Sequence, residues 1–102
     1  MPSIQDLERL LRDDPGDAFL LYGLAHEYAR TGRHDAAIEH YDRCLVADPG
    51  MSYAYYHKAR SLVALGRAPE AVLVLRAGIE RARAANDSHA VSELVAMLDE
   101  LT

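Results

Sequence analysis

Cysteine, tryptophan and basic side chains are scarce in this chain of 102 residues. The single cysteine, Cys44, cannot form an internal disulfide, so the fold does not depend on an oxidising compartment. Eleven basic against sixteen acidic residues give a net charge of −5, without the basic field typical of nucleic-acid-binding proteins. No apolar run approaches the roughly 18–20 residues that cross a bilayer, and the N-terminal residues do not resemble a secretion signal. We therefore expect a cytoplasmic protein with neither nucleic-acid nor membrane partners.

Glycine and proline are also few, but they recur at a fixed interval. A 34-residue step separates Gly32 from Gly66 (66 − 32), and the same step separates Pro15 from Pro49 (49 − 15). It also separates five further pairs: Ala25 and Ala59, Tyr28 and Leu62, Arg33 and Arg67, Ala37 and Ala71, and Tyr41 and Leu75. A period of this length is the signature of stacked supersecondary units.

Helical spacing of apolar residues, helix-capping residues and turn signals predict an all-α chain, since no strand-like alternation occurs. The predicted helices cover 3–12, 17–30, 34–46, 52–64, a segment that begins near Pro69 and continues to 85, and 89–101. Glycines are expected to end the second and fourth helices in the left-handed conformation. Asp14-Pro15-Gly16 and Asp48-Pro49-Gly50 are expected to end the first and third.

The periodic positions resemble the tetratricopeptide repeat. In the first unit they are Leu21, Ala25, Tyr28, Gly32, Ala37, Tyr41, Cys44 and Pro49. In the second they are Tyr55, Ala59, Leu62, Gly66, Ala71, Leu75 and Gly78, with Arg83 where the family has proline. The resemblance implies a right-handed superhelical stack of antiparallel helix pairs in a single domain, 1–102. Its expected parts are a capping half-repeat (3–14), two repeats (18–51 and 52–85) and a terminal capping helix (88–101).

In this family the first helix of each repeat lines a concave surface that holds a peptide or helix of a partner. The corresponding positions here are Phe19, Tyr22, His26, Arg30, Tyr53, Tyr56, His57 and Arg60. Helix geometry places Glu27 off this groove, which leaves the groove locally positive and suited to an acidic segment. The alternative is that the aromatic residues, above all Phe19 and Tyr53, pack under neighbouring helices.

His26 and His57 occupy the positions of two asparagines that grip a terminal carboxylate in the chaperone-binding branch of the family. Histidines could also donate to a carboxylate, more strongly below about pH 6.5. The position of a helping lysine holds Tyr22, however, so the full clamp of that branch is absent. The alternative is that both histidines are ordinary solvated side chains.

The chain shows no motif for catalysis or for a cofactor. His40 and Cys44 have a spacing that can hold zinc, but Cys44 stands at a small-residue packing position without further ligands nearby. We therefore expect neither an enzyme nor a metal site. The favoured hypothesis is a non-catalytic protein-interaction module. The alternative is a homo-oligomeric assembly protein that uses its repeat ends or its terminal helix, and a metal-responsive protein is a third, more distant hypothesis.

Overall fold

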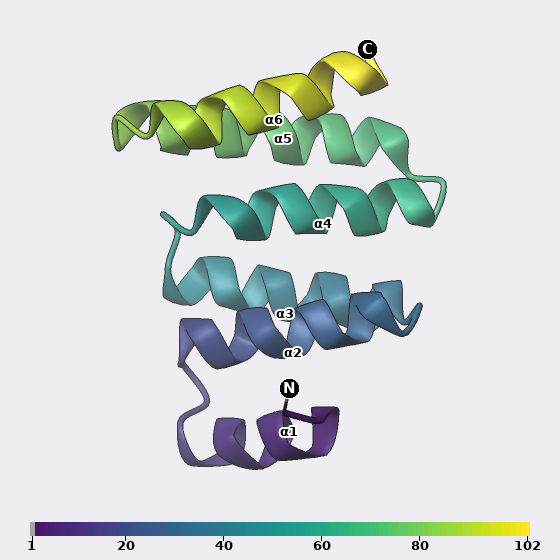
Figure 1. Ribbon diagram of the computed structural model, residues 1–102, viewed down its shortest axis with the longest axis vertical. Coiled ribbons are helices and arrows are strands. Elements are labelled where there is room, and N and C mark those ends of the chain that lie inside the picture. The colour runs from purple at the N-terminus through teal and green to yellow at the C-terminus, as the bar shows by residue number, and fades with distance from the viewer. Residues whose placement is uncertain (1) are drawn as a thin grey trace.

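The computed structural model describes residues 2–102, which form six helices in one elongated stack (Figure 1). The helices are α1 (Ile4–Asp13), α2 (Ala18–Arg30), α3 (His34–Ala47), α4 (Ser52–Ala64), α5 (Ala68–Ala84) and α6 (Ser88–Leu101). Each helix packs on the next one along the chain, and the ends of the stack are α1 and α6. The prediction of an all-α stack is confirmed, and each helix boundary lies within a residue or two of its expected position.

Local side-chain chemistry starts three of the helices. Ser3 and Asp6 form a reciprocal capping box at the start of α1, in which each side chain accepts from the other residue's backbone N–H. Asp17 accepts from the Leu20 N–H at 3.1 Å, and Asp87 accepts from the Ala90 N–H at 3.1 Å. These bonds satisfy backbone donors that a helix start leaves unpaired.

A left-handed residue ends α2, α4 and α5. Gly32 and Gly66 have φ of 84° and 76°, and Asn86 takes the same role at 56°. The N–H of the following residue then donates back across the helix end, as from Arg67 to the Leu62 carbonyl at 2.8 Å. This is the Schellman arrangement, which reverses the chain tightly enough for antiparallel packing.

Within the core, small side chains lie where the two helices of a pair cross. Ala25 and Ala37 are fully buried in the first pair, as are Ala59 and Ala71 in the second. Gly78 lies so close to α4 that an added Cβ would stand 2.8 Å from the Cβ of Tyr55. Small residues at such crossings let the helix axes approach closely.

Cys44 is fully buried, as expected for a core position. Its thiol donates to the Met51 sulfur at 3.3 Å, and burial raises the pKa of the thiol to about 11. The expected packing role of this cysteine is confirmed. In the part of the chain that the structure describes, no helix is both long and apolar enough to cross a membrane.

Candidate protein-binding groove

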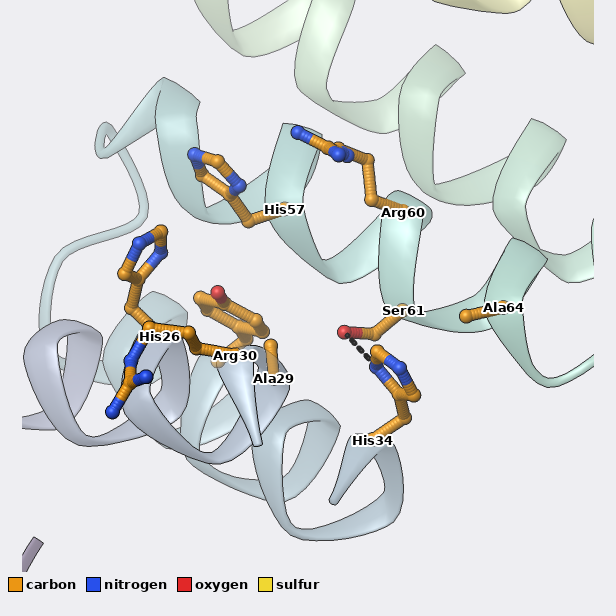
Figure 2. A pocket seen from close by; sticks show the side chains of 9 residues that line it. His26, Ala29, Arg30, His34, His57, Arg60, Ser61 and Ala64 are labelled. Carbon is orange, nitrogen blue, oxygen red and sulfur yellow. Dashed lines mark hydrogen bonds between the residues drawn. The ribbon is translucent and has the colours of Figure 1, made fainter. Parts of the chain in front are cut away.

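A cleft of about 290 Å³ opens between α2, α3 and α4 (Figure 2). It is lined by His26, Ala29, Arg30, His34, Tyr41, His57, Arg60, Ser61 and Ala64. Four of these residues, His26, Arg30, His57 and Arg60, are among the eight predicted from the sequence. The cleft therefore combines imidazole, guanidinium and hydroxyl groups from three helices, a set of groups suited to recognising an anion.

The imidazoles of His26 and His57 point toward one another across the cleft, with ring centroids 5.2 Å apart in an edge-to-face arrangement (Figure 2). Tyr22 stacks on His26 at 6.2 Å and meets the edge of His57 at 5.9 Å. Loss of solvent lowers the pKa of His57 to about 4, and the neighbouring His26 and Arg60 add to this effect. His57 is therefore neutral at pH 7 in the absence of a ligand.

Two buried polar atoms on residues that line the cleft have no hydrogen-bond partner among the described residues: Nδ1 of His26 and the hydroxyl oxygen of Tyr41. Tyr41 is 0% exposed, and burial raises the pKa of its phenol, so the hydroxyl keeps its proton and can donate. A buried polar group without a partner costs about 1–3 kcal/mol. A ligand that supplies the missing partner would recover part of that cost.

Five residues of the cleft were not predicted from the sequence, and three of them carry polar groups: His34, Tyr41 and Ser61. His34 lies at the start of α3, and its Nδ1 is 3.1 Å from the hydroxyl of the buried Ser61 (Figure 2). The sequence does contain a signal for Ser61. It stands one repeat period after Glu27, and these two are the buried polar residues among those described. Equivalent positions of the two repeats therefore both hold a buried polar side chain.

Glu27 lies off the cleft, as helix geometry predicts, but it modifies the charge of the groove. Its carboxylate accepts from Arg30 at 3.0 Å and 2.8 Å, and this interaction holds the pKa of Glu27 below its usual value. The charge of Arg30 is thus partly neutralised. Arg60 lies with its guanidinium 6.0 Å from the ring centre of Tyr56 and carries no ion pair in the described structure.

A second hollow of about 300 Å³ continues along the same face toward α6. It is lined by Tyr53, Tyr56, His57, Glu93, Ala96, Met97 and Glu100. Two acids of α6 therefore face the aromatic residues of α4, so the positive character expected for the groove applies only to its α2 end. Sequence periodicity could not show this, because α6 does not follow the 34-residue register.

Of the eight predicted residues, Phe19 stands apart. It is 79% exposed and lines neither hollow, so it does not pack under a neighbouring helix. Tyr53 is also exposed, whereas Tyr22 and Tyr56 are half-buried. Within residues 2–102, no group of three or more His, Cys, Asp or Glu side chains is arranged to hold a metal ion.

Comparison with known proteins decides the family. The tetratricopeptide repeat model matches residues 3–52 and, in a second overlapping match, 22–89. The chain belongs to the tetratricopeptide repeat (TPR) family. The resemblance inferred from the 34-residue period is therefore confirmed.

Individual relatives agree with this assignment. The chain is 29% identical to the TPR repeat-containing protein PA0015 of Pseudomonas aeruginosa, over 96% of its own length and 93% of that protein. It is 34% identical to superkiller protein 3 of Saccharomyces cerevisiae over 72% of its length, but spans only 5% of that much longer protein. Among solved structures, PcrH in complex with the chaperone-binding region of PopD superposes with a TM-score of 0.89 at 20% identity. That superposition covers 96% of this chain and 74% of PcrH, and it supports the shared fold.

Proposed function

We propose that this TPR protein is a non-catalytic interaction module that holds an acidic segment of a partner protein against its concave face. The observation that carries the proposal is the cleft between α2, α3 and α4, where two buried polar atoms have no hydrogen-bond partner, and Arg60 has no ion pair, among residues 2–102. Phe19, Tyr22, Tyr53 and Tyr56 would supply flanking contact area, because aromatic rings lose little conformational entropy on binding.

A carboxylate fits the inner part of the cleft better than a cation does. The Tyr41 hydroxyl can donate to it, either histidine can donate from one ring nitrogen, and Arg60 can add a charged hydrogen bond. A bound cation would instead meet the guanidinium of Arg60. The acids at the α6 end, Glu93 and Glu100, would set the direction of the segment by repelling its negative charges.

The family supports an interaction role at the general level. PcrH, which has the same fold, was crystallised with a region of another protein, PopD, and that partner belongs to PcrH alone. The partner of the present protein is proposed only by its chemistry, as a segment that contains a carboxylate.

The test is a selection from a displayed library of short peptides, followed by titration of the strongest binder by calorimetry. We expect the selected peptides to be rich in Asp or Glu. The double variant Tyr56→Ala/Arg60→Ala should weaken binding at least tenfold, because it removes a contact surface and the free charge. Tyr41→Phe should weaken binding without lowering the thermal midpoint, since it removes only a hydroxyl that has no partner in the described part of the chain.

Arg43→Ala is the matched control, because Arg43 is an exposed arginine of α3 that faces α1 and lines neither hollow of the groove. It should bind the peptide as the wild type does. Binding that survives the double variant, or falls equally in the control, would show that the groove assignment is wrong.

A further inference from the structure

The two ends of the stack are complementary halves of one repeat. By the 34-residue step, α1 corresponds to α3 and α5, which are the second helices of their pairs. At the other end, α6 packs on α5 as α4 packs on α3, so it is the first helix of a pair. The described stack therefore has an unpaired second helix at one end and an unpaired first helix at the other.

The face that α6 would turn toward a partner helix is apolar and incompletely covered. In the two complete pairs, the first helix presents three buried residues to its partner: Leu21, Ala25 and Tyr28 in α2, and Tyr55, Ala59 and Leu62 in α4. The same pattern recurs in α6 as Val91, Val95 and Leu98, slightly later than the repeat period would place it, because α5 has 17 residues where α3 has 14. These three are only half-buried, and among the described helices α6 contacts α4 and α5 alone.

The matching face of α1 is open at its two ends. The second helix of a pair presents Ala37, Tyr41 and Cys44 in α3, all fully buried. The corresponding residues at the N-terminal end of the stack are Ser3, Leu7 and Leu10; Leu7 is buried in the core, whereas Ser3 is exposed and Leu10 is 47% exposed. Leu10 is thus a large apolar side chain without cover at a position that is a core position in the complete pairs.

The sizes of the two faces are complementary. In the second complete pair, a large residue on the first helix, Tyr55, lies against a small one on the second helix, Gly78. The end helices reverse the order, with the smaller Val91 on α6 and the larger Leu10 on α1. If α1 of one copy lies on α6 of another, a larger side chain therefore again lies against a smaller one at this crossing.

The hollow beside α6 is the counterpart of a hollow near α1, which α3 of the same chain bounds on its third side. One hollow lies between α1 and α2, and α3 forms its third wall. The residues of α1 and of the turn after it that line this hollow are Glu8, Leu11, Arg12 and Pro15. Their counterparts two repeat periods later line the hollow between α5 and α6: Arg76, Ile79, Glu80 and Arg83. Within residues 2–102 this second hollow has no third wall, and α1 of a second copy would supply it.

The two segments that would face each other across this hollow have opposite net charges. The segment 4–14, which contains α1, carries four acids and two arginines, whereas the last half of α5, residues 76–84, carries three arginines and one glutamate. A docked α1 would face that basic segment across the hollow, as α3 faces α1 within the chain, with Asp6 and Arg9 in the places of His40 and Arg43.

We propose that copies of this protein associate head to tail, with α1 of one copy packed on Val91, Val95 and Leu98 of the next to complete a third TPR unit. Such a contact joins two different surfaces, so it can extend from copy to copy without closing. It uses none of the residues of the proposed peptide cleft, so its failure would leave the peptide-binding proposal intact.

The test is sedimentation velocity over roughly a hundredfold range of concentration. The wild-type mass should rise with concentration beyond that of a dimer. Leu10→Glu blocks the α1 surface and Leu98→Glu blocks the α6 surface, so each variant alone should stay monomeric. Mixed together they should form a one-to-one dimer and no larger species, because each retains the surface that the other lacks. Leu73→Glu, on an exposed leucine of α5, is the control and should associate like the wild type.

A wild type that stays monomeric throughout, or a mixture of the two variants that stays monomeric, would overturn the proposal. So would dimerisation of Leu10→Glu by itself, which would indicate pairing of two α6 faces. If circular dichroism shows that Leu98→Glu is unfolded, the exposed charge reversal Arg83→Glu replaces it. That variant should weaken association several-fold at low salt and less at high salt; an unchanged association constant would count against the proposal.

Discussion

Replacing Gly78 by alanine tests how closely α5 approaches α4. An alanine Cβ at this position would stand 2.8 Å from the Cβ and 2.9 Å from the Cγ of Tyr55, and 3.4 Å from Cδ1 of Leu94. The first two distances fall inside van der Waals contact, and the atoms concerned lie next to the α4 backbone, so they cannot rotate away. The helices must therefore separate locally, which also disturbs the packing of α6.

Two opposing terms set the size of the effect. Overpacking of a tight core costs about 1–3 kcal/mol. Alanine in a helix interior gains about 1 kcal/mol over glycine. We expect the free energy of unfolding of Gly78→Ala to fall by about 1 kcal/mol, which for a domain of this size lowers the thermal midpoint by about 4–8 °C.

Gly23→Ala is the matched control, because Gly23 also lies in a helix interior. An added Cβ there would stand 3.9 Å from Leu7, an ordinary contact distance. This variant should gain about 0.5–1 kcal/mol, since it keeps the propensity term without the overlap. The free energies of unfolding of the two alanine variants should therefore differ from each other by about 2 kcal/mol. Gly78→Ala should be less stable than the wild type and Gly23→Ala more stable.

Urea unfolding followed by far-ultraviolet circular dichroism measures both variants under the same conditions. Equal slopes of the free energy of unfolding against urea concentration would show that both variants expose the same surface on unfolding. A shift of the midpoint then reports a change in stability alone. If Gly78→Ala proves as stable as Gly23→Ala, the close approach of the two helices does not constrain this position, and the reasoning fails.

Two further predictions concern the histidine cluster and the turns. The folded chain keeps His57 neutral down to about pH 4 while the unfolded chain protonates it near 6.5, so the free energy of unfolding should fall as the pH drops through this window. Urea titrations at several pH values should show the wild type losing up to about 3 kcal/mol more than His57→Gln; parallel pH profiles would contradict the low pKa. Gly66→Ala should lose about 1 kcal/mol because φ there is 76°, whereas Asn86→Gly at φ 56° should not lose stability. Thermal unfolding compares the two, and equal losses would argue against the left-handed turns.

Much of the fold could be predicted because its causes are local or repeated. The capping box of Ser3 and Asp6 and the left-handed glycines act within a few residues of chain, so their chemistry is visible in the sequence. The repeat period shows which small residues share a position, and hence that Ala25 and Ala37 belong to the core. The extended length of α5 displaced α6 from that period, so positions on α6 could not be assigned by it.

The candidate site was predicted only in part. The pattern along the first helices of the repeats marks His26 and His57 as neighbours on one face. It does not show that Tyr41 reaches the same cleft from α3, or that His34 reaches Ser61. Those meetings depend on how far one helix tilts and slides against another, which local pattern does not specify.

The sequence by itself therefore determined the class of fold, the family and the turns, because periodicity and capping are properties of the chain alone. Only the tertiary structure decided the electrostatics of the groove. It paired Arg30 with Glu27 and placed Glu93 and Glu100 at the far end, and it left the Tyr41 hydroxyl and one nitrogen of His26 without a partner among the described residues. Burial and charge proximity arise when helices pack, and they set the pKa of His57 and the chemistry that the groove can recognise.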